Sequence, residues 1–433
     1  MVLRRLTGFT LLPLLSLVTP FLLLPVVARV SGPAGWSSFV AGQAIGTIGA
    51  TVVFWGWNVI GPVLAARAGD VEARTEVYAV SLRTRYLLLI VVVPVAVVVS
   101  ALVATTGHRV DAAAMAAATT LLGLSPSWFG IGVGNPWLLF WYDTLPRVAA
   151  AVAAAALVWL TSLVWVYPVL LAVAVAGSLS AFRRRHVPGA RGALVSPWPV
   201  ARSLGDLRLH LGTAGINLAA TAYASTPVPI ATVALRAEVS SRFASADSLY
   251  RFALFTVTAL GNAFQGWTLE EDSEQPVDRR PRHRAAWSAH LGLGVVGAVA
   301  FATLGPWATG LLFGSAVQAP RDVCVYYGVA FLFLSASSPA IRNVLLPTGR
   351  VRLVFGWTLA SAVVGLALMG AAAASGWVAG IALGMAVSEA LLFVGLLGPA
   401  LRALASTGLT SSRVPKVAAD ENSQTSESGR EEG

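Results

Sequence analysis

Long apolar runs constrain this chain more than any other feature of its sequence. Of its 433 residues, 56% are hydrophobic and only 12% are charged. A soluble protein carries about twice that charged fraction, and one globular core cannot bury so much apolar surface. Most runs are close to the roughly 20 residues that an α-helix needs to cross the hydrocarbon core of a bilayer. The sequence therefore predicts an all-α, polytopic membrane protein.

We expect twelve membrane-spanning helices. Two runs, 145–182 and 353–400, are too long for a single span. An interfacial turn around Pro168, with aromatic neighbours, divides the first run, and Ser375-Gly376-Trp377 divides the second. The expected spans are approximately 8–28, 39–65, 86–106, 112–134, 145–163, 165–182, 209–235, 248–269, 286–313, 323–346, 353–373 and 377–400.

The distribution of arginine supports this count. With the N-terminus placed in the cytoplasm, most basic residues fall in cytoplasmic loops, as the positive-inside rule requires. Both termini are then cytoplasmic, and the expected location is the cytoplasmic (cell) membrane, with multiple passes. The outer loops receive only a minority of the arginines, namely Arg29, Arg109, Arg236, Arg242 and Arg321.

The sequence also contains a short internal repeat. Thr19-Pro20 and Arg29 return at the same spacing as Thr226-Pro227 and Arg236. Six spans per half would make the two halves parallel repeats around a central cavity, and the prolines would bend the first helix of each half. The expected divisions are an N-terminal six-helix bundle at 1–182, a basic cytoplasmic linker at 183–208, a C-terminal six-helix bundle at 209–402 and a disordered cytoplasmic tail at 403–433.

The sequence gives no indication of catalysis, of metal binding or of nucleic acid as a partner. Cys324 is the only cysteine, and the five histidines show no ligand-like spacing. We place residues 236–247 in an outer loop, where Glu238 and Asp247 form no paired-carboxylate pattern. The arginines lie in short loops, which fits membrane topology better than a nucleic-acid surface. We therefore expect a protein that is not an enzyme and that has no metal or cofactor.

Polar residues inside the expected spans are the candidates for function, because each is costly in lipid. Cations outnumber acids among them, so a cavity lined by these residues would attract an anion such as a phosphate or diphosphate, which Arg can hold bidentately. The candidate substrate-binding residues are Arg29, Asn58, Arg236, Arg251, Asn262 and Arg342, and the candidate coupling-ion residues are Glu389 and Asp143.

These candidates also have structural interpretations, which the sequence leaves open. Arg29, Arg236 and Arg342 stand near the ends of spans, where a long side chain can reach the headgroups. The two asparagines suit interhelical hydrogen bonds equally well, and Glu389 could be a hydrogen-bonded structural acid.

Three segments resemble polysaccharide/O-antigen-type flippases for lipid-linked oligosaccharides, in the multidrug/oligosaccharidyl-lipid/polysaccharide exporter superfamily. Residues 20–36 resemble the family's first helix, which contains proline and ends in Arg before a Gly-containing turn and an aromatic residue. Residues 39–43 and Gly56-Trp57-Asn58 are similar to its next segment. Leu346-Pro347-Thr348-Gly349-Arg350 resembles its loop between the tenth and eleventh helices.

The resemblance implies two six-helix bundles around a central cavity. It implies flipping of an undecaprenyl-diphosphate-linked oligosaccharide to the outer leaflet for cell-surface polysaccharide biosynthesis. The implied partners are this polyprenyl-diphosphate-linked glycan, membrane lipid and polysaccharide-assembly proteins. Only Arg29 carries over from the family motif by position, as a ligand for the diphosphate.

Two other functions stay open. A multidrug/toxin cation antiporter would have the same fold, although such exporters tend to place carboxylates in the first or seventh helix, where this chain has none. An integral glycosyltransferase or polymerase would need sizeable outer loops, which the expected topology does not provide.

Overall fold

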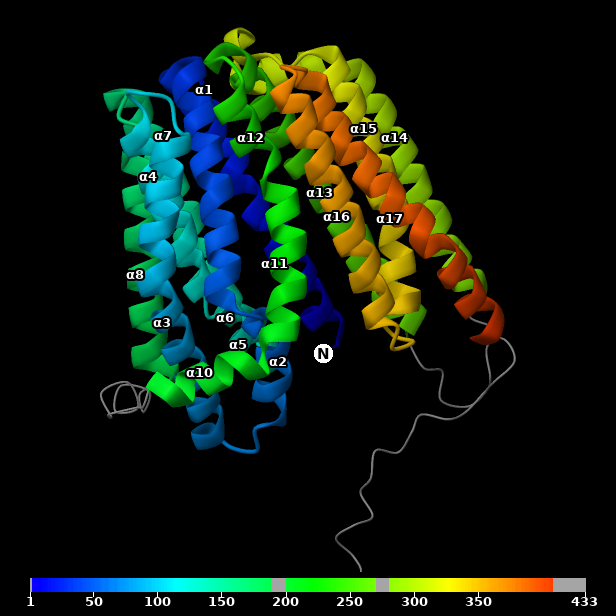
Figure 1. Cartoon of the computed structure of the whole chain (residues 1–433). Coiled ribbons are helices and arrows are strands. Elements are labelled where there is room, and N and C mark those ends of the chain that lie inside the picture. Colours follow the sequence, from blue (N-terminus) through cyan, green and yellow to red (C-terminus); the bar gives the residue numbers. More distant parts are fainter. Residues whose placement is uncertain (1, 188–199, 270–279, 408–433) are drawn as a thin grey trace, which may run out of the picture.

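The computed structural model of the chain describes residues 2–187, 200–269 and 280–407. Within these ranges every regular element is a helix (Figure 1). The helices form two groups that lie close together at one end and diverge toward the other (Figure 1). We call the end with the bend at Gly32 the upper end and the end with the short helix at 200–209 the lower end.

The N-terminal group consists of long helices joined by short turns. A 3₁₀ turn (η1) covers Leu122–Leu124 and a π-helical segment (η2) covers Phe140–Thr144. The α-helices are α1 (Val2–Phe54), α2 (Trp57–Arg67), α3 (Val71–Val103), α4 (Arg109–Leu121), α5 (Ser127–Gly132), α6 (Pro136–Leu139), α7 (Leu145–Thr161) and α8 (Val166–His186).

The C-terminal group follows α10 (Val200–Leu209), which crosses the lower end (Figure 1). It includes the 3₁₀ turn η3 (Ser315–Val317) and the π-helical segment η4 (Ala340–Leu345). Its α-helices are α11 (Leu211–Ser225), α12 (Pro227–Ala234), α13 (Ala237–Leu269), α14 (Arg280–Phe313), α15 (Arg321–Pro339), α16 (Val351–Ala374) and α17 (Val378–Thr407).

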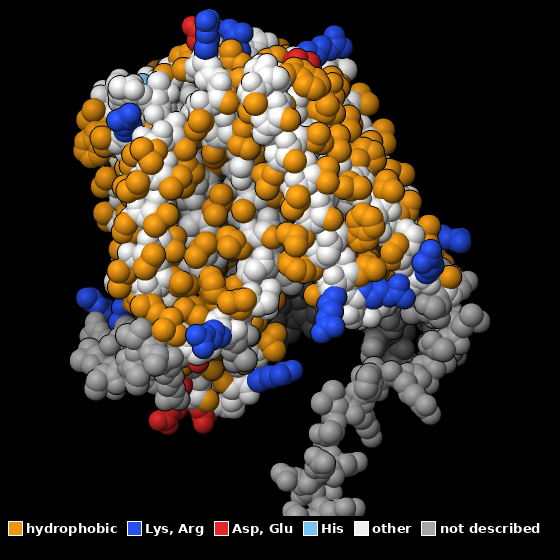
Figure 2. Space-filling model, viewed as in Figure 1, with side chains coloured by type: hydrophobic (Ala, Val, Ile, Leu, Met, Phe, Trp, Pro, Cys, Tyr) orange, Lys and Arg blue, Asp and Glu red, His pale blue; other side chains and the backbone are white. Residues whose placement is uncertain are grey.

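The surface of the described chain has the polarity of a membrane-spanning protein. On the face shown in Figure 2, charged side chains gather at the two ends and a broad apolar band lies between them. Among the described residues, eight helical segments are long and apolar enough to cross a membrane, namely Phe21–Arg67, Val71–Val103, Pro136–Thr161, Val166–His186, Pro281–Phe313, Arg321–Leu345, Val351–Ala374 and Val378–Ala405. The protein is therefore an all-α, polytopic membrane protein, as the sequence predicts.

The expected spans outside those eight segments are helical as well. Residues 112–134 are divided among α4, η1 and α5, and residues 209–235 are divided between α11 and α12. Residues 248–269 lie within α13, which also carries the polar stretch that precedes them. The breaks between α4, η1 and α5 and between α11 and α12 leave helices that are too short for a simple span. Polar residues lower the hydropathy of α13.

The two long runs divide where the sequence predicts. The chain turns between α7 and α8 through Ser162, which has a left-handed φ of 59°. It turns between α16 and α17 through Gly376, with a φ of 71°. Each run therefore supplies two antiparallel helices instead of one helix longer than the bilayer is thick.

The prolines expected to bend the first helix of each half have different settings. Pro20 and Pro25 lie inside α1, whose backbone leaves helical geometry at Gly32, between the expected spans 8–28 and 39–65, with a φ of 64° and a ψ of −179°. Glycine tolerates this conformation because it has no Cβ. In the second half the helix does break at the Thr-Pro pair, since α11 ends at Ser225 and α12 begins at Pro227.

The expected outer loop at 236–247 is wrong, because α13 already begins at Ala237. Serines and charged residues interrupt the apolar pattern there, but the helix continues because it packs against other helices. The expected linker becomes helical at α10, and α17 runs five residues past the expected boundary at 402. The rest of the predicted tail (403–433) from residue 408 onward, and the linker residues 188–199, lie outside the described residues.

Helix α1 connects the two groups, since it packs against α3, α4 and α7 on one side and against α11, α12 and α13 on the other. Glycines let α4 approach it closely. A Cβ on Gly42 would lie 2.3 Å from the carbonyl oxygen of Ala112, and one on Gly46 would lie 2.6 Å from that of Ala116. Small residues of this kind allow tight helix packing in membranes.

We expect Gly42→Leu to destabilise the protein by about 1–3 kcal/mol or more, because the added side chain forces α1 and α4 apart. The measurement is the midpoint of thermal unfolding of the purified protein in detergent. Gly177→Leu on α8 is the matched control, because a Cβ there meets no atom within 4 Å. Equal midpoints for the two variants would contradict this account of the α1–α4 contact.

Candidate functional site

A cavity of about 350 Å³ lies between α1 and α13, where the two groups of helices meet. Its wall is largely apolar and includes Leu24, Val40 and Phe252. Its polar lining is supplied by Gln43 and Thr47 of α1 and by Ser248, Arg251 and Thr258 of α13. An apolar pocket with a few placed polar groups is typical of a small-molecule or headgroup site.

Among the described residues, Arg251 is the one ionisable side chain that lines this cavity, and the sequence predicts it as a substrate ligand. Its Nε donates a hydrogen bond to Asp247 Oδ2 at 2.5 Å, and its Nη2 donates to the carbonyl oxygen of Ala224 at 2.7 Å. Its side chain is 32% exposed, whereas that of Asp247 is 1% exposed. The guanidinium therefore faces the cavity while its counter-ion lies behind it.

Sequence reasoning missed Asp247 as a site residue, because it assigned 236–247 to a loop. In the structure Asp247 lies one helical turn before Arg251 on α13, and Tyr327 of α15 donates a hydrogen bond to its Oδ1 at 2.9 Å. The Asp-Arg spacing of four was the available signal. This spacing indicates an ion pair only when both residues lie on one helix.

The cavity is closed at its upper end by contacts between the halves. The buried Trp36 donates from Nε1 to Ser245 Oγ at 3.0 Å, and its ring stacks on Phe313 with centroids 5.1 Å apart. Phe21 and Phe252 add a second ring contact, at 4.3 Å between centroids. These contacts join α1 to α13 and to the end of α14.

Arg29 belongs to this closure and does not line the cavity. Its Nη1 and Nη2 donate to the carbonyl oxygens of Leu312 and Leu311, each at 2.5 Å. These carbonyls belong to the last turn of α14, where free acceptors and the helix dipole favour a cation. The structure therefore assigns the Arg29 side chain a contact with a helix end.

The predicted residues Arg342 and Asn262 lie together. The Nη2 of Arg342, in η4, donates to Oδ1 of Asn262 at 2.7 Å. Asn262 stands one helical turn beyond Thr258, which lines the cavity. This pair therefore continues the polar face of α13 from the cavity toward the lower end.

Asn58 and Arg236 lie away from the cavity. Asn217 of α11 donates to Oδ1 of Asn58 at 3.3 Å, so the two asparagines join the halves near the lower end. Arg236 is exposed between α12 and α13, at the upper end. Arg29 and Arg236 occupy matching positions in the sequence, but their contacts differ. Among the described residues Arg29 contacts a helix end and Arg236 does not.

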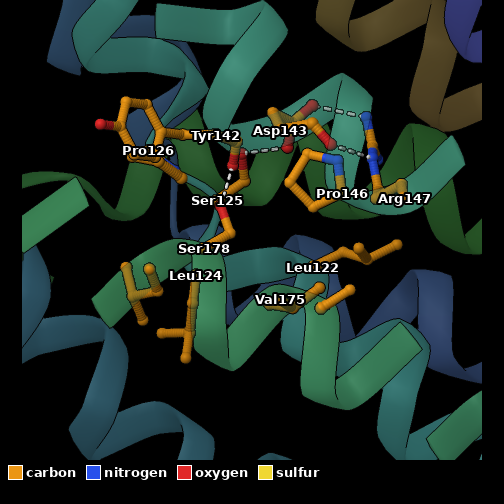
Figure 3. A pocket seen from close by; sticks show the side chains of 12 residues that line it. Leu122, Leu124, Ser125, Pro126, Tyr142, Asp143, Pro146, Arg147, Val175 and Ser178 are labelled. Atoms are coloured by element: carbon orange, nitrogen blue, oxygen red, sulfur yellow. Dashed lines mark hydrogen bonds and ion pairs between the residues drawn. The ribbon is translucent and has the colours of Figure 1, made fainter. Parts of the chain in front are cut away.

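The two predicted coupling-ion acids have different surroundings. Glu389, on α17, is 7% exposed, and its carboxylate lies within electrostatic range of the hydroxyls of Tyr223 and Tyr250. Asp143 lines a small pocket of about 10 Å³ in the N-terminal group (Figure 3).

Both carboxylate oxygens of Asp143 are engaged. Oδ2 accepts from Arg147 Nη2 at 2.5 Å, and Oδ1 accepts from Ser125 Oγ at 2.6 Å (Figure 3). The pocket has room for about one water molecule. This geometry gives Asp143 a structural contact, and its role toward a coupling ion stays a prediction.

Comparison with known proteins identifies the fold. No protein-family model matches the chain, and no curated protein sequence matches it. Among solved structures, the lipid II flippase MurJ in an inward closed conformation is similar with a TM-score of 0.66 and 9% identity, over 94% of this chain and 90% of that chain.

Two transporters of the MATE family are also similar. One is an inward-facing multidrug resistance MATE family transporter of the MOP superfamily, with a TM-score of 0.58 and 14% identity over 93% of this chain and 100% of that chain. The other is the eukaryotic MATE transporter AtDTX14, with a TM-score of 0.51 and 14% identity over 93% of this chain and 98% of that chain. At these identities the likeness shows a shared fold.

We expect Arg29→Ala to open the upper end of the cavity. Hydrogen bonds to a charged group are worth about 1.5–3 kcal/mol, so their loss should shift the equilibrium toward an open upper end by roughly tenfold or more. The measurement is labelling of Thr47→Cys by an impermeant maleimide from the predicted outer face, in a Cys324→Ala background. Arg236→Ala is the control, and labelling that rises equally in both variants would contradict the closure role of Arg29.

Proposed function

We propose that this protein is a membrane transporter that flips an undecaprenyl-diphosphate-linked oligosaccharide from the cytoplasmic to the outer leaflet of the cytoplasmic membrane. The observation that carries the proposal is the guanidinium of Arg251 at the wall of a cavity between two helix groups. A diphosphate is a doubly charged or more highly charged anion, which an Arg side chain holds through two parallel hydrogen bonds.

The rest of the lining fits the remainder of the headgroup region. Leu24, Val40 and Phe252 offer apolar contact to the first units of a prenyl chain. Gln43, Thr47 and Thr258 offer hydrogen bonds to the first sugar or to phosphate oxygens. A cavity of about 350 Å³ suits a headgroup, and the long prenyl chain can stay in lipid.

The contacts between the halves suggest how access alternates. The upper closure made by Trp36, Ser245 and Arg29 would hold while substrate enters from the lower end. Its release, together with formation of contacts below the cavity, would expose the same site to the outer leaflet. Arg342 lies on the path from the lower end, where it can attract the anion before it reaches Arg251.

The proposed orientation places the lower end in the cytoplasm. Arginines at α2–α3, at the end of α8 and at α16 belong to that end, among them Arg67, Arg184 and Arg352. The positive-inside rule favours this orientation. The divisions of the chain, with bundles at 1–182 and 209–402, stay part of the proposal.

Glu389 is the preferred coupling site within this proposal. A buried carboxyl group can exchange a proton or hold a monovalent cation when the helices around it rearrange. It packs in the C-terminal group, where α17 contacts α12, α13 and α15. Movement of α12 and α13 during alternating access would change its surroundings.

The second candidate is a multidrug/toxin cation antiporter. The buried acids Asp247 and Glu389 favour it, because carboxylates are the groups that hold a cationic drug or a coupling ion. The partly exposed guanidinium of Arg251 opposes it, because it would repel a cationic drug at the cavity wall.

We expect Arg251→Ala to lower glycan output by about tenfold or more in a complementation assay of a strain that lacks its lipid-linked oligosaccharide flippase, because a bidentate anion contact is lost. Arg251→Lys should retain part of the activity, since it keeps the charge without the bidentate geometry. Arg352→Ala, at an exposed site in α16, is the control for expression and insertion.

Wild-type glycan output from Arg251→Ala would refute the anion site. If the wild-type chain instead fails to complement and lowers the accumulation of cationic drugs in the same cells, the antiporter replaces the flippase.

A separate experiment tests the orientation. Arg184→Cys, at an exposed position near the end of α8, should react with an impermeant maleimide only after the cells are opened, in a Cys324→Ala background. The native thiol of Cys324 is buried, so the substitution removes only background labelling. Full labelling of intact cells would reverse the proposed topology.

A further inference from the structure

We propose that Asp247 and Tyr327 are positioning residues for Arg251, which hold its guanidinium so that two N–H groups face the cavity as a fork for a phosphate oxyanion. The inference rests on the proposed function, because it takes Arg251 as the ligand for a diphosphate. It adds two residues that do not line the cavity but that set how the ligand is held.

Three helices fix the direction of the guanidinium. On α13, Arg251 Nε donates to Asp247 Oδ2 at 2.5 Å, and Nη2 donates to the carbonyl oxygen of Ala224 on α11 at 2.7 Å. Tyr327 on α15 donates to Asp247 Oδ1 at 2.9 Å. A guanidinium is planar, so two fixed N–H groups determine where the others point.

The remaining N–H groups of Arg251 are available to a ligand. No described residue accepts a hydrogen bond from Nη1, and Nη2 has a second N–H beyond the one that Ala224 accepts. These groups lie on neighbouring nitrogens, as two oxygens of one phosphate group require. Because Arg251 lines the cavity and Asp247 is buried behind it, we place this fork on the cavity side. An anion can then bind without displacing Asp247 or Ala224.

The contact with α11 follows from the helix break at the Thr-Pro pair. Ala224 lies in the last turn of α11, where carbonyl oxygens lack an N–H partner within the helix. Pro227, which begins α12, has no N–H to donate. The carbonyl of Ala224 and the negative end of the helix dipole therefore suit a cation. The break thus supplies one of the two acceptors that orient Arg251.

Tyr327 prevents Asp247 from closing the fork. A carboxylate has two oxygens and can accept from two N–H groups of one arginine. Tyr327 engages Oδ1, so Asp247 contacts Arg251 through Oδ2. Without the tyrosine hydroxyl, the buried carboxylate would need another donor for Oδ1, and the guanidinium already beside it can supply one. Arg251 would then turn toward Asp247 and away from the cavity.

The test measures the affinity of the purified full-length protein, in a non-ionic detergent, for farnesyl diphosphate. We expect Tyr327→Phe to weaken binding about threefold to tenfold, because the guanidinium turns away from the cavity. Tyr326→Phe is the matched control, since it removes the same hydroxyl from a side chain that lines a separate groove beside Arg321. The control should change the affinity by less than about twofold.

A double-mutant cycle separates positioning from a general packing effect. Arg251→Lys keeps the charge but presents rotatable donors in place of a planar fork, so binding no longer depends on how a plane is oriented. In the Arg251→Lys background, Tyr327→Phe should therefore change the affinity by less than about twofold. A loss of equal size in both backgrounds, or in Tyr326→Phe, would overturn the positioning role.

A second variant keeps the inference testable if Tyr327→Phe does not fold. Asp247→Glu keeps the negative charge but moves the carboxylate by one methylene group, so it changes the geometry at Arg251 and not the net charge of the site. It should weaken binding of farnesyl diphosphate about threefold to tenfold. An unchanged affinity in Asp247→Glu would overturn the positioning role.

Failure of the proposed function gives a different result. In that case the wild-type protein would not bind farnesyl diphosphate, or Arg251→Ala would bind it as tightly as the wild type, and both proposals would fall. Binding that depends on Arg251 but not on Tyr327 would leave the flippase proposal in place and reject only the positioning role.

Discussion

The packing of α1 across the C-terminal half is the contact on which the rest of the structure depends. Trp36 carries this contact, because its indole is fully buried, donates to Ser245 and stacks on Phe313. An indole N–H buried without an acceptor would be costly, so the hydrogen bond fixes the register of α1 against α13. That register places Gln43 and Thr47 opposite Arg251 and so defines the cavity below.

Charge in the described part of the cavity wall is balanced by its surroundings. Arg251 faces the cavity, and Asp247 and the carbonyl of Ala224 accept hydrogen bonds from two of its N–H groups. Arg29 is satisfied in another way, by the carbonyl end of α14. In both places the guanidinium meets acceptors supplied by packed helices, a carboxylate and a carbonyl at Arg251 and two helix-end carbonyls at Arg29. One solution leaves the cation available to a ligand, and the other uses it to close the protein.

Sequence reasoning succeeded where local chemistry decides and failed where packing decides. The turns at 162–165 and 375–377 could be predicted, because a helix longer than the bilayer is thick must break and the aromatic residues and glycine mark the place. The break at Gly32 could be predicted as well, because it lies between the expected spans 8–28 and 39–65, where the sequence has a Gly-Pro pair. Residues 236–247 were predicted as a loop because charged residues and serines interrupt the apolar pattern, although burial among other helices makes them helical.

The sequence by itself determined that the protein lies in a lipid bilayer, that it is helical and approximately where its spans are. A bilayer requires long apolar helices, whichever other helices they pack against. It also determined that Arg251 is a candidate ligand, since a charged side chain within a span is costly and usually marks a functional site. Only the tertiary structure decided which side chains meet. It placed Tyr327 of α15 against the Asp247–Arg251 pair, Arg342 against Asn262, and Arg29 against the end of α14. These partners are set by how helices that are distant in sequence pack together, and no local pattern in the chain encodes that arrangement.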